Sequence, residues 1–400
     1  MSSLPQSAPG STSTLRVANQ QRVLDLLRRT AGAAEIDETT GGPAGDAETF
    51  TQAEIARGTG LAPATVSNIV RDLAAAGLVA ADPGSGRRGS AVRLAPGAGT
   101  VAGVDFGHSH VAVALGDLTG RVLAEERRSL SRAHHHTEAL EIAAEMLERM
   151  SVDYSTVRHV GLGLPAPVTR EAVGSPSIFP GWEGVNTRQV AEERFGAPVV
   201  VENDANLGAL AEHRHGVGRG HDSSVFVKIS SGVGAGIIID NRLYHGSGGT
   251  AGEIGHLTLD EQGPLCRCGS RGCLEAYTSS GPVLDMMAAQ LPGAGLDEIF
   301  DAARDGHISA QRALEDAGLH LGWALASIVN LINPAIVVVG GDMARAGELL
   351  LASARIGLRR HALDSVAMTP VLGSLLGERA SLVGAVLMAA ERTELVVDGT

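Results

Sequence analysis

The chain has 400 residues, of which 44% are hydrophobic and 19% are charged, a composition typical of globular domains. This length exceeds what one hydrophobic core usually serves, so we expect two or three domains. No stretch approaches the roughly 20 apolar residues that a membrane helix needs, and the first residues lack the pattern of a secretory signal. The sequence therefore predicts a cytoplasmic protein with no membrane partner.

The formal net charge of −13 is unevenly distributed along the chain. Residues 1–100 hold nine arginines and nine acidic residues, so residues 101–400 carry the whole negative charge. Five of those nine acids lie in the Gly/Ala/Thr-rich stretch 31–49, and the rest of the N-terminal region has a net charge of +5. A small basic module on a large acidic body favours DNA binding at one end.

The N-terminal region begins with a Ser/Pro/Gly/Thr-rich stretch, residues 1–15, which we expect to form a disordered tail. A first helix is predicted over residues 16–30, where Val23, Leu24 and Leu27 recur at helical spacing. Residues 31–49 are expected to form a flexible insertion, so the next helix follows only after a gap.

Two further helices are predicted close together. One follows Thr51, which forms a capping box with Glu54, and it ends at Gly60. The other begins after Pro63. A short glycine turn between two such helices is the spacing of a helix-turn-helix, whose second helix enters the major groove of DNA.

The second helix of this pair offers polar side chains that suit base reading, since Asn can pair with adenine and hydroxyls reach bases or phosphates. These candidates are Thr65, Ser67, Asn68 and Arg71. A turn and strand pattern follows, and it places Arg87 and Arg88 at a wing tip, near phosphates or a minor groove. We interpret residues 16–95 as a winged helix-turn-helix domain. The alternative is a small helical dimerisation module that carries an arginine-bearing loop.

After a small-residue linker at 96–100, the pattern changes to short, β-rich runs that glycines bound. Helical segments such as 138–150 and 319–332 lie between these runs. Alternating strands and helices predict an α/β fold with mixed sheets over residues 101–395.

The three cysteines lie within eight positions and, with one histidine, have the spacing H-x9-C-x-C-x4-C. These four residues are His256, Cys266, Cys268 and Cys273. Three thiolates and an imidazole form a closed tetrahedral set, which suits structural Zn²⁺ better than a catalytic ion. The alternative is three free thiols and an unrelated histidine.

Four motifs occur in order in the C-terminal region: VENDAN at 201–206, GEIGH at 252–256, the cysteine knuckle at 256–273, and GCLEAY at 272–277. Together they resemble the ROK family of repressors, open reading frames and sugar kinases. With its N-terminal module, the chain resembles the repressor branch, which responds to sugars of the xylose or N-acetylglucosamine type.

The resemblance implies a ribonuclease H-like fold, also called the actin-like ATPase fold, with two α/β lobes on either side of a cleft. The implied lobes are about 101–206 plus a C-terminal helix near 381–392, and about 207–380. It also implies sugar contacts from Asn203, Asp204, Glu253, His256 and Glu275. In the family's kinases, Asp204 matches the base that takes the proton of the attacking sugar hydroxyl. His256 would bind zinc with one nitrogen and the sugar with the other.

The phosphate-binding loops depart from the kinase pattern. The family's kinases have D-x-G-G-T-K, whereas this chain has bulky His108 and His110 in place of the second Gly and the Lys. A second loop has Ser230 in place of its first Gly. The remaining nucleotide-site residues are Asp105, Gly107, Ser109, Gly232, Gly234, Gly340 and Gly341. Loss of a turn glycine at a phosphate contact weakens ATP binding.

These patterns favour a sugar-responsive transcriptional regulator, a repressor that binds operator DNA as a homodimer or a dimer of dimers and holds a structural zinc ion. One alternative is a sugar kinase that uses Mg-ATP and carries a DNA-binding appendage. Another is a DNA-bound regulator that no longer binds sugar and uses its acidic body for protein partners.

Overall fold

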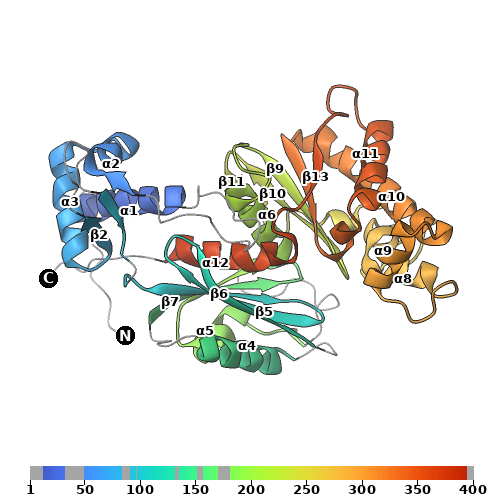
Figure 1. Cartoon of the computed structure of the whole chain (residues 1–400), viewed down its shortest axis with the longest axis horizontal. Coiled ribbons are helices and arrows are strands. Elements are labelled where there is room, and N and C mark those ends of the chain that lie inside the picture. The colour runs from blue at the N-terminus through green and yellow to red at the C-terminus, as the bar shows by residue number, and fades with distance from the viewer. Residues whose placement is uncertain are drawn as a thin grey trace.

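The computed structural model describes residues 12–31, 49–82, 91–95, 97–130, 135–150, 156–169 and 181–393 (Figure 1). Most of the predicted tail and of the 31–49 insertion lies outside these residues, as do Arg87 and Arg88 at the predicted wing tip. Among the described residues, no helix is long and apolar enough to cross a membrane.

The N-terminal domain has three helices and a small sheet. The helices are α1 (Thr12–Ala31), α2 (Gln52–Thr59) and α3 (Pro63–Ala75). The strands β1 (Phe50–Thr51), β2 (Val79–Asp82) and β3 (Ala91–Leu94) pair antiparallel in the order β1-β3-β2. Helix α1 starts at Thr12, so the last four residues of the predicted tail are helical instead. The predicted capping box is confirmed, because Thr51 and Glu54 bond to each other's backbone amides.

The core of this domain continues into the next one. Val23, Leu24 and Leu27 are buried against α3, as their spacing predicts. The same cluster includes Ala98 from the predicted linker and Ala390 from the C-terminal helix. Arg158 also donates to the Ala98 carbonyl at 2.6 Å. Ala98 of the predicted linker is therefore packed, and the N-terminal domain has an extended apolar contact with the body of the chain.

The first lobe is built on a five-stranded sheet of order β6-β5-β4-β7-β8. Its strands are β4 (Thr100–Phe106), β5 (His110–Asp117), β6 (Val122–Ser129), β7 (Val157–Leu164) and β8 (Val199–Asn203). The first three pair antiparallel, and β7 and β8 add parallel to β4. Helices α4 (His136–Met150) and α5 (Thr187–Phe195) cover one face, and α12 (Ala380–Arg392) covers the other (Figure 1).

The second lobe has a sheet of order β11-β10-β9-β12-β13. Its strands are β9 (Ser224–Ile229), β10 (Val233–Ile239), β11 (Arg242–Leu243), β12 (Ile336–Gly340) and β13 (Val371–Gly373). One face packs on helices α7 (Glu275–Thr278), α8 (Ser280–Met287), α9 (Leu296–Arg304), α10 (Ile308–Ile332) and α11 (Glu348–His361). The 3-10 helices are η2 (Ile254–His256), η3 (Asp342–Ala346) and η4 (Gly377–Arg379). The mixed α/β fold predicted from the sequence is confirmed.

Two helices lie between the sheets and join the lobes. Helix α6 (Asp204–His215) packs on β9 and β10, α12 packs on β4, β5 and β7, and the two helices pack on each other. Glycines allow this close approach: a β-carbon at Gly384 of α12 would overlap the carbonyl oxygen of Leu207 in α6, and one at Gly161 of β7 would overlap that of Ala385.

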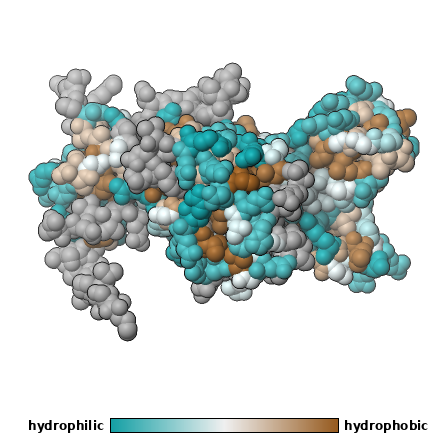
Figure 2. Space-filling view, turned by 90° about the horizontal axis from the view of Figure 1, so that it is seen from below, coloured by the Kyte–Doolittle hydropathy of each residue, from teal (hydrophilic) through white to brown (hydrophobic). Residues whose placement is uncertain are grey.

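On the face shown in Figure 2, hydrophilic areas separate the hydrophobic ones. An exception among the described residues is the α10 and α11 end, where Trp323, Leu331, Leu363 and Met368 are exposed. Trp323 stacks on His361, so side chains from both helices share this surface.

The crossing of α6 and α12 predicts the effect of a one-carbon change. Gly384→Ala forces the two backbones apart, and we expect a loss of about 2 kcal/mol or more in the free energy of unfolding. The control is Gly281→Ala near the start of α8, where an added β-carbon meets nothing within 4 Å and the helix should be stabilised slightly. Melting temperatures from calorimetry measure the effect of each substitution on stability. Equal melting temperatures for the two variants would contradict the tight crossing.

Candidate functional site

A cleft opens between the lobes at the N-terminus of α6. All five predicted sugar contacts line it together with the loop at Gly232 and Gly234, and four of them are Asp204, Glu253, His256 and Glu275. Asn203 also lines the cleft, but its side chain has structural partners. Its oxygen caps α6 by accepting from the amides of residues 205 and 206, and its Nδ2 donates to residue 166.

Lys228 is a functional candidate that the motifs did not reveal. It is the only lysine in the chain, since the other 31 basic residues are arginines, and it stands in the apolar strand β9. Along β9, Val225, Val227 and Ile229 face α10, so residue 228 points the other way, toward α6 and α12. The sequence feature that could have identified Lys228 is a lone lysine within an apolar strand.

The Lys228 ammonium lies among groups from both lobes. It donates to Asp204 Oδ2 at 2.8 Å and to the Ser381 hydroxyl of α12 at 3.1 Å. Asp105, at the end of β4, is buried nearby. Burial by itself would lower the pKa of Lys228, but the charges of Asp204 and Asp105 outweigh it and raise that pKa above its ordinary value. The lysine is therefore a fixed cation at neutral pH.

The charge of Asp105 is equally well fixed. Burial would raise its pKa, but the Lys228 ammonium and a hydrogen bond with His110 hold that pKa at about 2. The His110 Nε2 lies 3.1 Å from Asp105 Oδ2. In this arrangement the Lys228 ammonium faces both carboxylates and offsets part of their negative charge.

The side chains of the altered loops occupy the phosphate side of the cleft. The His110 ring lies against Gly107, so closely that a β-carbon there would overlap it. His108 Nδ1 lies 3.1 Å from the Ser231 hydroxyl and so connects the first loop to the second. The Ser230 hydroxyl accepts from the Asp342 amide at 3.1 Å. The residues retained from the nucleotide pattern thus surround space that this chain's own histidines partly fill.

Not all of that pattern shares one wall. Asp105, Gly107, Ser109 and Gly341 line the cavity beside Lys228, whereas Gly232 and Gly234 line the sugar side. Gly340 packs against the Phe226 ring. The positive φ of Gly341, 82°, and its close approach to the Ile229 backbone explain why this turn requires glycine.

Glu275 and Glu253 differ in their surroundings. Both oxygens of Glu275 accept from Arg267, at 2.7 and 2.8 Å, and one also accepts from the Val233 amide. Burial would raise the pKa of Glu275, but Arg267 lowers it. Glu253 has no such cation. Burial raises its pKa to about 7, and the charges of Asp204 and Glu275 add to this. Near neutral pH, Glu253 can therefore donate or accept a hydrogen bond.

The cysteine knuckle forms a compact cluster whose four ligand atoms lie within 4.8 Å of one another. Cys268 and Cys273 sulfurs are 3.7 Å apart, and Cys266 Sγ is 3.8 Å from His256 Nδ1. A tetrahedral ion with sulfur ligands at about 2.3 Å places them about 3.8 Å apart, so the cluster fits a metal ion. His256 also lines the cleft, which connects the metal cluster to it.

The predicted recognition helix is α3. Ser67, Asn68 and Arg71 are exposed and Thr65 is half-buried, while the apolar residues of α3 face the core. Arg71 donates to the Asn68 oxygen at 2.6 Å. The antiparallel strands β2 and β3 form the base of a wing beside this helix. This arrangement of α2, α3 and wing is that of a winged helix-turn-helix.

Comparisons with known proteins agree with this architecture. The family model described as "ROK family" matches residues 101–392, and the one described as "MarR family" matches residues 43–88. The chain therefore belongs to the ROK family and carries a MarR-type winged helix at its N-terminus. Its body has the two-lobed fold of actin-like ATPases.

Among its relatives, the xylose repressor of Bacillus spizizenii is 30% identical over 84% of this chain and 89% of that protein. A solved ROK family transcriptional regulator, described as a homologue of the Escherichia coli MLC protein, has a TM-score of 0.74 and 25% identity over 94% of this chain and 97% of that one. A ROK glucokinase from Streptomyces griseus, solved with glucose and AMPPNP, has a TM-score of 0.65 and 30% identity. It matches 73% of this chain and 99% of its own.

Replacement of Lys228 tests the charge cluster. Lys228→Met leaves Asp105 and Asp204 without their cation, and we expect a loss of about 3 kcal/mol in the free energy of unfolding at pH 8. Without the ammonium, burial raises the pKa of Asp105, so the variant should recover stability as the pH falls toward that pKa. The native protein gains nothing from Asp105 over this range, because there its pKa is about 2.

Melting temperatures at pH 8 and pH 5 measure this effect. Lys228→Arg is the matched control, since it keeps the charge and should lack the recovery at low pH. A Lys228→Met protein with the native melting temperature at both pH values would show that the ammonium does not stabilise the cluster.

Proposed function

We propose that this chain is a sugar-responsive, DNA-binding transcriptional repressor of carbohydrate-metabolism genes. The observation that carries the proposal is the joining of an exposed recognition helix to a body of the sugar-kinase type, in which His108, His110 and Lys228 line the cavity on the phosphate-loop side. Similarity to a xylose repressor over both parts of the chain supports it.

The sugar site proposed is the cleft around Asp204, Glu253, His256 and Glu275. A sugar needs hydrogen-bonding groups that converge on its hydroxyls, and these side chains supply them. Lys228 donates to Asp204 Oδ2, and we propose that this paired carboxylate accepts a hydrogen bond from a sugar hydroxyl rather than removing its proton. A sugar that reaches Glu275 must share that carboxylate with Arg267.

The DNA site proposed comprises Thr65, Ser67, Asn68 and Arg71 on α3, with Arg87 and Arg88 on the wing. We expect the protein to act as a homodimer, because paired helix-turn-helix units read half-sites a fixed distance apart. The exposed apolar surface of α10 and α11, with Trp323 and Leu331, is the face that we propose for pairing.

Operator binding tests this function. Selection from random DNA should yield a palindromic site, and a sugar should change the affinity for that site at least about fivefold. Asn68→Ala should weaken specific binding about tenfold, because a good base contact contributes about 1–3 kcal/mol. Gln290→Ala, an exposed residue of the second lobe, is the control and should bind like the native protein. Binding no tighter than to random DNA, with and without sugars, would refute the proposal.

The rival function is ATP-dependent sugar phosphorylation, which the retained Asp204 and the similarity to a glucokinase favour. A coupled assay of ADP release across hexoses, pentoses and N-acetyl sugars separates the two. We expect no turnover above that of Asp204→Ala. Turnover that this substitution abolishes would establish the kinase instead.

We further propose that the cysteine cluster holds one structural zinc ion per chain. Burial raises the pKa of the Cys266 thiol to about 12 in the metal-free chain, so a bound cation is what would favour its thiolate. When bound, zinc would fix the His256 ring, which in turn orients the cleft.

Elemental analysis of the purified protein should find about one zinc per chain. Cys268→Ser should lower the zinc content and the melting temperature, because a tetrahedral site loses one of its four ligands. Gln262→Ala, an exposed neighbour in the knuckle, should keep both values. A stable native protein that contains no metal would contradict the zinc site.

A further inference from the structure

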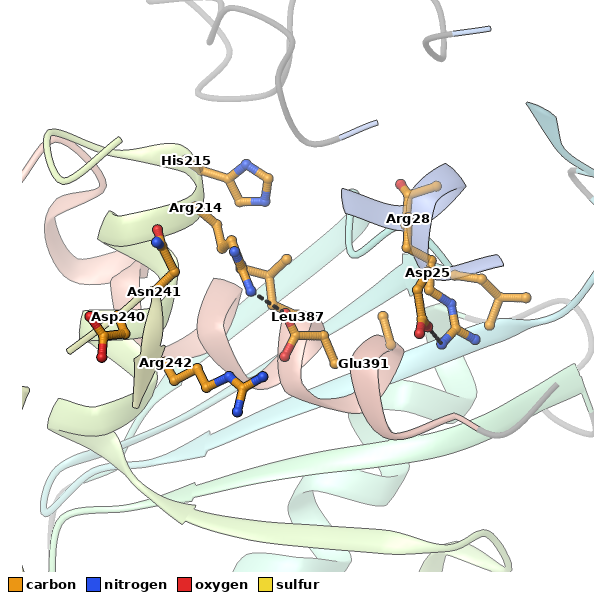
Figure 3. A pocket seen from close by; sticks show the side chains of 12 residues that line it. Asp25, Arg28, Arg214, His215, Asp240, Asn241, Arg242, Leu387 and Glu391 are labelled. Carbon is orange, nitrogen blue, oxygen red and sulfur yellow. Dashed lines mark hydrogen bonds and ion pairs between the residues drawn. The ribbon is translucent and has the colours of Figure 1, made fainter. Parts of the chain in front are cut away.

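A second cavity lies where the N-terminal domain meets both lobes (Figure 3). Its volume is about 460 Å³, within the range of about 300–1,000 Å³ that is typical of small-molecule sites. Its walls come from α1, the β5–β6 turn, the end of α6, the β10–β11 turn and α12. It shares no lining residue with the sugar cleft.

Arg28 of α1 is the buried cation of this cavity, with 7% of its surface exposed. Its Nη2 donates to the carbonyl of Thr393 at 2.8 Å. Its Nε and Nη1 have no hydrogen-bond acceptor among the described residues. The Asp25 carboxylate forms an ion pair with Arg28, but its Oδ1 is 4.0 Å from Nη1, too far for a hydrogen bond. Buried charged donors without acceptors are costly, so these two N–H groups favour an occupant that accepts hydrogen bonds.

The lobes supply a second available cation. Arg242, the first residue of β11, extends its side chain toward Glu391 (Figure 3), and among the described residues its guanidinium has no hydrogen-bond or ion-pair partner. Arg214 is already paired with Glu391 at 3.1 Å. Asp25 accepts from Gln21 at 2.8 Å. Two arginines on different structural units therefore face one cavity, and each has guanidinium N–H groups that lack an acceptor among the described residues.

We propose that this cavity binds a small organic or inorganic anion through Arg28 and Arg242. A carboxylate or a phosphate group has the several oxygen acceptors that guanidinium groups pair with. The acidic residues Asp25, Asp240 and Glu391 also line the cavity. They disfavour highly charged polyanions, so the ligand class is a compact metabolite with one such anionic group.

Because of where the cavity lies, a bound anion should affect both the sugar cleft and the position of the N-terminal domain. The sugar cleft lies at the N-terminal ends of α6 and α12, near Asp204 and Ser381, and this cavity lies at their C-terminal ends, near His215 and Glu391. An anion that joins α1 to the β10–β11 turn fixes the N-terminal domain relative to the second lobe. This coupling rests on the proposed sugar response, whereas the anion site itself does not.

Anion binding is tested with the full-length protein in the absence of sugar and DNA. Inorganic phosphate and, separately, the monocarboxylate lactate are titrated against chloride at constant ionic strength, with the melting temperature and calorimetric heat as readouts. We expect saturable stabilisation by at least one of them, and the two arms distinguish a phosphate site from a carboxylate site. No saturable effect of either anion would overturn the proposal.

Variants locate the anion. Arg242→Gln should weaken binding about tenfold, and Arg28→Gln should abolish it. Arg28 is buried, so its replacement can impair folding. The variant of the exposed Arg242 is therefore the decisive test. Arg360→Gln, an exposed arginine at the end of α11, is the control and should bind normally. Binding that Arg242→Gln leaves unchanged, or that Arg360→Gln weakens equally, would also overturn the proposal.

A separate sugar titration, with and without the anion that binds, measures the coupling. Its expected result is a change in sugar affinity of at least about fivefold. If no sugar binds while the anion does, the sugar proposal fails and the anion site stands. If sugar binds with an affinity that the anion does not change, the coupling is refuted.

Discussion

The arrangement of the cleft depends on one buried interaction, the ammonium of Lys228 between the carboxylates of Asp204 and Asp105. Each carboxylate comes from a different element, α6 and β4, and the lysine comes from the sheet of the opposite lobe. The ammonium offsets only part of the charge of two carboxylates, so the cluster also depends on hydrogen bonds to nearby polar groups, including Ser381 and His110. The lobes are therefore joined at the cleft by charge as well as by the packing of α6 on α12.

That interaction also bears on the choice between a sugar sensor and a phosphotransfer enzyme. Phosphoryl transfer needs cations that hold the transferring phosphate and a base that is free to take a proton. Here Lys228 is bound to Asp204, the candidate base, and His108 and His110 line the cavity beside it. Glu253 and His256 line the other part of the cleft, where we propose that a sugar binds. The proposed sugar response therefore depends on the Glu253 and His256 side of Asp204, whereas phosphoryl transfer would also need the side that Lys228 and the histidines line.

The sequence predicted the elements with the strongest local chemistry. The capping box at Thr51, the apolar face of the first helix and the cysteine spacing depend on neighbours a few residues away, and the structure places them as predicted. The predicted start of the first helix, at residue 16, was wrong. Helix α1 begins at Thr12, within residues whose composition resembles a disordered tail. The packed Ala98 was also unexpected, because a small residue in a linker acquires its burial only from distant partners.

Long-range partners explain what else was missed. Lys228 stands out in the sequence as the only lysine, but its role requires Asp105, 123 positions earlier, and Ser381, 153 positions later. Arg28 looks like any helix arginine until Thr393, 365 positions away, accepts its hydrogen bond. Both residues connect α12 to another part of the molecule, Lys228 at the helix's first turn and Arg28 just past its end. A helix held at both ends by cations from two different domains gives the DNA-binding domain a physical connection to the cleft. This connection follows from the tertiary structure and cannot be read from any one motif.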